Sequence, residues 1–299
     1  MIPVYVTALV IVVAGLLSFL PFRYWPALRF GPRLDEGKIR NQVRKHPELA
    51  ALVSARLDPS ALTGLALTIA AAVAVVGAVF FGLVFFMIRR HFGIADLDVS
   101  AARFAARHAT HGSTTVLRMF TQLGGAVVLV PLAVVVWLAV GRRRSLKASF
   151  AFLVLAVGGQ FAVADLVKWI VDRARPNFDR LTGFSGPSFP SGHATASACC
   201  LAAFALLAGV GRSPRVQAVL ASVAVALAAG ISCSRVFLGV HWLTDVIGGL
   251  LLGWTWFALC SIAFGGRLLD FAHPAEELEQ TAERSRAPSG GHLRAEGVR

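Results

Sequence analysis

The chain has 299 residues, of which 56% are hydrophobic and only 15% are charged, and its mean hydropathy is +0.68. A soluble domain of this size needs a polar surface, which this composition cannot supply. The charge is strongly basic, with 29 Lys and Arg against 16 Asp and Glu. Most of these cations lie between apolar segments, where they set topology and contact anionic lipid. We therefore expect the lipid bilayer, and not nucleic acid, to be the partner of this charge.

Seven apolar segments predict seven membrane-spanning helices. Each approaches the roughly 20 residues that a helix needs to cross the hydrocarbon, and a helix satisfies its own backbone polar groups in lipid. We expect an all-α, polytopic membrane helical bundle, in which a six-helix core follows one extra N-terminal transmembrane helix. In chain order the segments are, approximately, residues 3–20, 62–88, 124–140, 148–170, 194–211, 216–233 and 243–265.

Three regions follow from this layout. Residues 1–61 are expected to hold the N-terminal transmembrane helix and a basic amphipathic connector, residues 62–266 the six-helix core, and residues 267–299 a polar, disordered cytoplasmic tail. The first apolar segment lacks a basic n-region and a small-residue cleavage site, so we expect a retained helix and not a signal sequence. Within the core, residues 94–122 predict a short helix at the outer membrane interface.

The distribution of Lys and Arg orients the expected bundle. Residues 22–60 hold eight, residues 142–147 hold four, residues 211–215 hold two and the tail holds five. If all seven segments cross, these regions share one side, which the positive-inside rule makes cytoplasmic. The opposite loop, residues 89–124, holds five over a longer stretch. The N-terminus is then expected to face outward.

Three polar clusters stand at the ends of apolar segments, where a charge is costly unless function or pairing requires it. They are Lys168-x6-Arg175-Pro176, closing the fourth segment, Pro190-Ser191-Gly192-His193, opening the fifth, and Ser234-Arg235-x5-His241-x3-Asp245, joining the sixth to the seventh. These segment ends all fall on the same side of the membrane. We therefore expect all three clusters to share one face, opposite residues 142–147.

The cations and the Ser-Gly pair of these clusters suit phosphate binding. Guanidinium groups match phosphate oxygens, and clustered cations stabilise the charge on a transferring phosphoryl group, which points to Lys168, Arg175 and Arg235. Ser191 is expected to cap the helix that follows it. Gly192 would let backbone N–H groups approach an anion at the positive end of that helix.

The remaining residues suit the chemistry of a phosphoester. His193 and His241 offer a nucleophile and a proton donor, the two roles that such a reaction needs. Asp245 follows His241 by four residues, which on a helix places both on one face. The carboxylate could then accept one imidazole N–H and leave the other nitrogen free to attack.

The three motifs resemble the signature of the type 2 phosphatidic acid phosphatase superfamily, which includes membrane lipid phosphatases and, more distantly, soluble vanadium haloperoxidases and bacterial acid phosphatases. Every motif position is filled in order, and the resemblance covers about residues 62–265. It implies that His241 forms a phosphohistidine, that Asp245 holds the tautomer of His241, and that His193 protonates the leaving group and then activates water. It also implies a phosphate site, made by Lys168, Arg175, Ser191, Gly192 and Arg235.

The function expected from this resemblance is hydrolysis of a lipid phosphomonoester or pyrophosphate, with undecaprenyl pyrophosphate, phosphatidic acid and phosphatidylglycerol phosphate as candidate substrates. The expected location is the bacterial inner (plasma) membrane, with the active site on the extracytoplasmic side. We expect no metal and no cofactor, because no carboxylate-rich cluster suits Mg²⁺ or a pair of zinc ions. Two alternatives stay open: a lipid phosphotransferase that uses the same phosphohistidine, and a non-enzymatic transporter or scaffold.

Four charged residues near the first motif lie outside the signature. Asp165 and Asp172 flank Lys168 and are interpreted as local ion-pair or interfacial residues. Arg173 and Arg180 are interpreted as loop or headgroup contacts.

Overall fold

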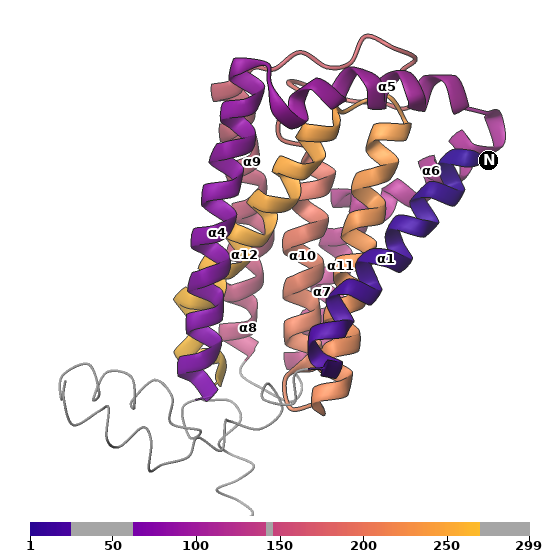
Figure 1. Cartoon of the computed structure of the whole chain (residues 1–299). Coiled ribbons are helices and arrows are strands. Elements are labelled where there is room, and N and C mark those ends of the chain that lie inside the picture. Colours follow the sequence, from indigo (N-terminus) through magenta and orange to yellow (C-terminus); the bar gives the residue numbers. More distant parts are fainter. Residues whose placement is uncertain (25–61, 142–145, 270–299) are drawn as a thin grey trace, which may run out of the picture.

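The computed structural model describes residues 1–24, 62–141 and 146–269, which form helices and the loops between them. The long helices run side by side, and shorter helices and a long loop lie across one end of the bundle (Figure 1). In chain order the helices are α1 (Ile2–Tyr24), α4 (Leu62–Arg90), η3 (Gly93–Asp96), α5 (Leu97–His108), α6 (His111–Thr121), η4 (Gln122–Gly124), α7 (Ala126–Gly141), α8 (Leu146–Leu153), η5 (Val154–Gly158), α9 (Gly159–Val171), α10 (Gly192–Gly209), α11 (Pro214–Phe237) and α12 (Leu243–Leu269).

The expected all-α membrane bundle is confirmed, and the chain is an integral membrane protein. Six spans of the described chain are long and apolar enough to cross a membrane. The third predicted crossing is less simple, because α7 has 16 residues, or about 24 Å at 1.5 Å per residue. It becomes a seventh span only together with residues 111–124, which meet it at a bend of 43°.

The fourth crossing is a continuous span, Lys147–Val171, that contains a π-helical turn, η5. A π-helical turn loosens the regular backbone ladder, and other groups take up the carbonyls it exposes. Leu155 O accepts the indole N–H of Trp256 at 3.1 Å, and Ala156 O accepts the thiol of Cys199 at 3.4 Å. The turn thereby ties this span to both α12 and α10.

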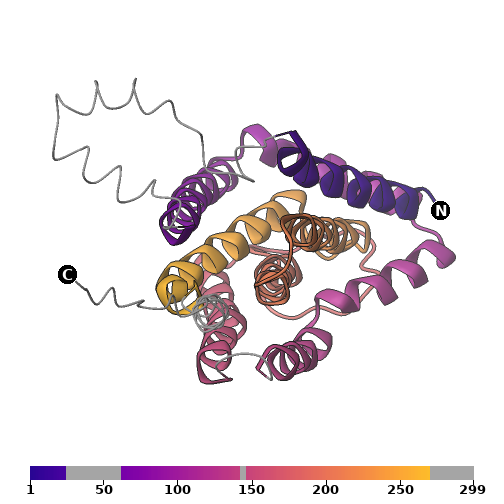
Figure 2. The same cartoon turned by 90° about the horizontal axis from the view of Figure 1, so that it is seen from below.

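Helix α10 lies inside a ring of other helices when the bundle is viewed along its axis (Figure 2). Small residues let it approach α12 closely, as is usual where membrane helices pack. A Cβ at Gly249 would lie 2.7 Å from Ser191 O and 2.8 Å from the Cβ of Ala194, and one at Gly253 would lie 2.7 Å from the Cβ of Ala198. The N-terminal halves of α10 and α12 are therefore held against each other.

The single interfacial helix expected within residues 94–122 is two helices. The break falls before α6, where Thr110 and Ser113 form a capping box, a strong signal for a new helix start. Helix α5 lies across the end of the bundle (Figure 1) and contacts α11 and α12. It buries Asp98, Ala102 and Ala105, so one of its buried side chains is a carboxylate.

Helix α1 packs on α11, and α4 packs on α12. The amphipathic connector expected within residues 22–60 and the tail expected at 267–299 fall outside the described residues, except for their first few positions. The basic segment 142–147 is described only from residue 146 onward.

The close approach of α10 and α12 predicts that Gly249→Ala destabilises the protein. The added methyl group meets a backbone oxygen at 2.7 Å, and overpacking of this kind costs about 1–3 kcal/mol. Thermal unfolding of the purified protein in detergent micelles measures the loss. Gly82→Ala is the matched control, because a Cβ there meets nothing within 4 Å. Equal unfolding temperatures for the two variants would contradict this packing.

Candidate active site

The three predicted motifs meet at the end of the bundle that carries α5 and the loop 172–191 (Figure 1). Lys168 comes from the last turn of α9, His193 from the first turn of α10, and Arg235 from the last turn of α11. Arg175 lies in the loop after α9, and His241 lies in the turn before α12. Lys168, Arg175, Arg235 and His241 are all close enough to His193 to act on it electrostatically.

The surroundings of His241 select one tautomer of its ring. Nη1 of Arg175 lies 3.2 Å from Nε2, and because a guanidinium only donates, Nε2 must accept. The neutral ring then carries its proton on Nδ1, which lies 3.5 Å from Oδ2 of Asp245. This is ion-pair distance, and Nδ1 makes no hydrogen bond. The arrangement leaves the lone pair of the neutral ring on Nε2.

The helical i,i+4 relation expected for His241 and Asp245 is wrong, because His241 precedes α12. The two side chains meet through a turn instead. Asp245 lies in the first turn of α12, and its Oδ2 accepts the backbone N–H of Trp242 at 2.8 Å, as the acidic member of a capping box does. The hydroxyl of Ser188 donates to the same oxygen. Helix capping therefore turns the carboxylate toward His241.

Burial sets the charge state of His241. The side chain is 3% exposed, and burial disfavours the charged imidazolium. Burial lowers the pKa of His241 to about 4; Asp245 opposes this shift, and Arg175 and Arg235 add to it. The ring is therefore neutral near pH 7 and is able to act as a nucleophile.

Arg175 is fully engaged by its surroundings. Its guanidinium donates to the backbone oxygens of Ser185, Gly186, Pro187 and Val240 at 2.7–3.1 Å and to Nε2 of His241. Burial is the main cause that lowers the pKa of Arg175. In this state Arg175 joins the segment 185–187 to the imidazole of His241. A phosphate at Nε2 would have to take over some of these N–H groups.

Arg235 and Ser191 are buried with polar atoms that lack partners. Arg235 is 4% exposed, Nη1 reaches Thr121 Oγ1 at 3.5 Å, and Nε has no partner. None of the ion pairs in the described residues includes Arg235. Ser191 is the N-cap residue of α10, as expected, but its hydroxyl makes no capping bond. A buried cation outside any ion pair of the described residues suits an anion, and an unpartnered buried hydroxyl offers a further hydrogen bond.

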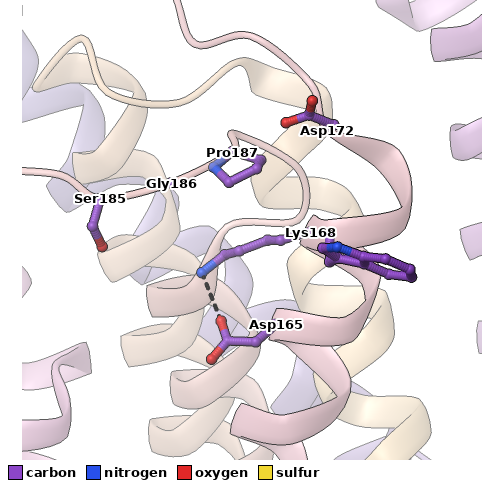
Figure 3. Close-up of a pocket in the computed structure, with 7 residues that line it drawn as sticks. Asp165, Lys168, Asp172, Ser185, Gly186 and Pro187 are labelled. Atoms are coloured by element: carbon purple, nitrogen blue, oxygen red, sulfur yellow. Dashed lines mark hydrogen bonds and ion pairs between the residues drawn. The ribbon is translucent and has the colours of Figure 1, made fainter.

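Lys168 connects this centre to a pocket of about 380 Å³. Figure 3 shows its side chain extending from α9 toward Ser185 and Gly186, with Asp165 beside the ammonium group. Nζ lies 3.2 Å from Oδ1 of Asp165, which confirms the predicted local ion pair. A Cβ at Gly192 would lie 3.4 Å from the same Nζ. Lys168 therefore lies between the pocket and the N-terminus of α10.

His193 is bordered by a glycine pair that the sequence analysis did not identify. A Cβ at Gly124 would lie 3.6 Å from Cδ2 of His193 and only 2.5 Å from Cγ2 of Ile231, and one at Gly125 would lie 3.6 Å from Nε2 of His193. The pair of adjacent glycines between α6 and α7 was the feature of the sequence that could have indicated this close approach. Small residues here let the chain pass over the imidazole.

Two further residues were misread or missed. The interpretation of Arg173 as a loop or headgroup contact is wrong, because Arg173 forms ion pairs with two buried carboxylates. One of these carboxylates, Asp98, was missed, because it lies outside all three sequence motifs. Among the described residues, no group of three or more His, Cys, Asp or Glu could hold a metal ion.

Comparisons with known proteins place the chain among membrane lipid phosphatases. Residues 147–268 match the family model of the PAP2 superfamily. Phosphatidylglycerophosphatase B of Bacillus subtilis (strain 168) is 34% identical over 148 residues, which cover 48% of this chain and 71% of that protein. A lipid A 1-phosphatase of Rhizobium etli is 37% identical over 119 residues, 36% of this chain and 47% of that protein.

A solved structure is also similar. The crystal structure of a transmembrane PAP2 type phosphatidylglycerolphosphate phosphatase from Bacillus subtilis superposes with a TM-score of 0.58 at 29% identity. The superposition covers 63% of this chain and 94% of that one.

The buried position of His241 predicts a depressed titration. We expect the imidazole to stay neutral on acidification through pH 6.5, its ordinary pKa, and to gain a proton only near pH 4. ¹⁵N NMR of histidine-labelled protein in detergent measures this, with His241→Asn identifying the signal. The neutral ring should show protonated Nδ1 and unprotonated Nε2. A pKa near 6.5, or the opposite tautomer, would contradict the geometry described above.

Proposed function

Because the chain belongs to the PAP2 superfamily, we propose that it is a membrane lipid phosphatase that works through a phosphohistidine on His241. The observation that carries this proposal is the buried, neutral imidazole of His241, with Asp245 at Nδ1 and a guanidinium at Nε2. We assign the catalytic core to residues 62–266 and regard α1 as an addition to it.

In the first step, the lone pair of His241 Nε2 attacks phosphorus and the bond from phosphorus to the leaving oxygen breaks. The leaving oxygen takes a proton from His193, which acts as the general acid. A positive charge develops on the His241 ring, and the carboxylate of Asp245 beside Nδ1 offsets it. The products of this step are a phosphohistidine and the lipid alcohol, or the lipid monophosphate when the substrate is a pyrophosphate.

In the second step, water replaces the lipid. His193, now neutral, removes a proton from water as the oxygen attacks phosphorus, and the bond from phosphorus to Nε2 breaks. Inorganic phosphate leaves and His241 returns to its neutral form. No metal is assigned a role, because each proton and charge is assigned to a side chain of this chain.

The phosphate oxygens are assigned to Lys168, Arg175, Arg235 and the start of α10. Arg235 supplies a buried guanidinium outside the ion pairs of the described residues. The hydroxyl of Ser191 is unpartnered, and the first N–H groups of a helix, here from Gly192 onward, have no acceptor within the helix. When phosphate binds, Arg175 would break some of its hydrogen bonds to the backbone oxygens of residues 185–187 and donate those N–H groups to the phosphate oxygens.

The proposed substrate is a lipid whose phosphate enters from the membrane surface. The relatives bear the names phosphatidylglycerophosphatase B and lipid A 1-phosphatase, which supports a phosphomonoester on a glycerolipid or a glycolipid. Phosphatidylglycerol phosphate, phosphatidic acid and undecaprenyl pyrophosphate are the substrates to compare.

The enzymatic prediction is that the protein in detergent releases phosphate from at least one of these lipids with EDTA present. His241→Ala should lower turnover at least about 10³-fold, as expected for loss of a nucleophile. His108→Ala is the matched control, because the contacts of His108 within the described part of the chain are with Phe104 of its own helix, α5. Full activity of His241→Ala would contradict the mechanism, and loss of wild-type activity in EDTA would contradict metal independence. Transfer of phosphate to an added alcohol without free phosphate would identify a phosphotransferase.

We further propose a location in the bacterial inner (plasma) membrane, with the site on the extracytoplasmic side. The turn between α10 and α11 lies at the end of the bundle opposite the site (Figure 1). Arg212 is in that turn and Arg215 is in the first turn of α11, which supports this orientation by the positive-inside rule.

Cysteine labelling in intact cells checks the orientation. Gly183, in the loop over the site, and Ser213, in the α10–α11 turn, are both exposed. A membrane-impermeant maleimide should label Gly183→Cys in intact cells and Ser213→Cys only after permeabilisation. The wild-type chain, whose cysteines are buried or half-buried, gives the background. The reverse pattern would place the site in the cytoplasm.

A further inference from the structure

Arg173 joins two buried carboxylates from different parts of the fold. Its Nη1 lies 2.6 Å from Oδ1 of Asp245, and its Nη2 lies 2.7 Å from Oδ2 of Asp98. Asp245 and Asp98 are 0% and 3% exposed. Buried carboxylates need partners to stay ionised, and the guanidinium of Arg173 forms an ion pair with each of them.

Thr244 completes the cluster. Its hydroxyl accepts from Nη1 of Arg173 at 2.8 Å and donates to Oδ2 of Asp98 at 2.6 Å. Its backbone N–H donates to Oδ1 of Asp98 at 2.9 Å. Asp98 thus uses both oxygens, and it caps the first turn of α12 from α5, a helix 146 residues earlier in the chain. The cluster fixes the turn on which Asp245 is carried.

The local backbone delivers Arg173 to this cluster. Helix α9 ends at Val171, and its C-cap residue Asp172 has left-handed backbone angles of φ 43° and ψ 48°. The backbone N–H of Ser188 donates to Arg173 O at 2.7 Å, and the guanidinium lies 5.6 Å from the ring centroid of Trp242. The guanidinium of Arg173 therefore reaches Asp98 and Asp245, although in the sequence Arg173 lies between Lys168 and Arg175, the residues proposed to bind phosphate.

The two oxygens of Asp245 have separate partners. Oδ1 accepts from Arg173, whereas Oδ2 accepts from Ser188 and the Trp242 N–H and faces Nδ1 of His241. The bond to Oδ1 fixes the rotation of the carboxylate and keeps it charged. Without Arg173, the negative charges of Asp245 and Asp98 would be buried close together, and one would be driven to take up a proton.

We propose that Arg173 and Asp98 are positioning residues for the reaction. Arg173 holds Asp245 ionised and turned toward His241, and Asp98 holds Arg173 and the first turn of α12 in place. Neither residue touches the phosphate. The proposal rests on the proposed function, because it takes His241 as the nucleophile that Asp245 orients.

The kinetic test compares Arg173→Gln and Asp98→Asn with Arg180→Gln in the full-length protein in detergent. We expect Arg173→Gln to lower kcat about 10²-fold and Asp98→Asn about 10-fold, each with KM within about threefold of wild type, because transition-state stabilisation and not binding is lost. Arg173→Lys should recover part of the lost kcat, since lysine restores the positive charge but not the paired N–H donors of a guanidinium. Arg180, which donates to Pro176 O and stacks on Phe184, should tolerate the change to Gln.

A double-mutant cycle tests whether the two residues act as one unit. If they do, Asp98→Asn should cost little further activity once Arg173 is already Gln. Independent, multiplicative losses would overturn the link between Asp98 and Arg173. A rise in KM at unchanged kcat for Arg173→Gln would overturn the positioning role and make Arg173 a substrate-binding residue.

A readout independent of turnover separates this proposal from the proposed function and from simple unfolding. In ¹⁵N-histidine spectra, wild type should show one His241 tautomer, protonated at Nδ1, and Arg173→Gln should show a mixture of tautomers in protein that remains monodisperse. An unchanged tautomer in Arg173→Gln would overturn the proposal. If wild type released no phosphate, hydrolysis would fail as the function, and this comparison alone would decide the positioning role.

Discussion

The carboxylate of Asp245 is buried at the first turn of α12, and the rest of the site is arranged around that buried charge. Isolated burial of a carboxylate is expensive unless it is paired and hydrogen-bonded. Here the carboxylate accepts hydrogen bonds from three donors: the backbone N–H of Trp242 at the helix start, the hydroxyl of Ser188 and the guanidinium of Arg173. The groups that stabilise the charge of Asp245 also fix the direction in which its carboxylate points. The same contacts therefore keep Asp245 ionised and aim it at His241.

Helix packing supplies the second constraint. The glycines of α12 let α10 approach until Ser191 N–H donates to the backbone oxygen of Asp245 at 3.0 Å. That contact joins the start of the helix that carries His193 to the start of the helix that carries Asp245. The distance between the proposed acid and the proposed nucleophile is therefore a consequence of small residues spaced four apart, deep in the bundle.

The sequence predicted the helices and the shared end of the motifs because hydropathy and parity act over long segments. It could not predict how side chains meet. His241 and Asp245 were expected on one helix, and a capping turn joins them instead. Arg173 was interpreted as a loop or headgroup contact, because a cation in a loop has no periodicity from which the direction of its side chain could be predicted. Asp98 lies in an amphipathic helix, and only the fold shows that it faces α12.

The central claim is that His241 carries the phosphoryl group, and trapping the intermediate tests it most directly. Protein in detergent would be mixed with a ³²P-labelled lipid phosphate, quenched in alkali within milliseconds and analysed for label retained on the chain. We expect a burst of label on wild type that is stable in alkali and lost in acid, as phosphoramidates are, and no label on His241→Ala. Absence of the burst in active wild type, or label that persists in His241→Ala, would contradict it.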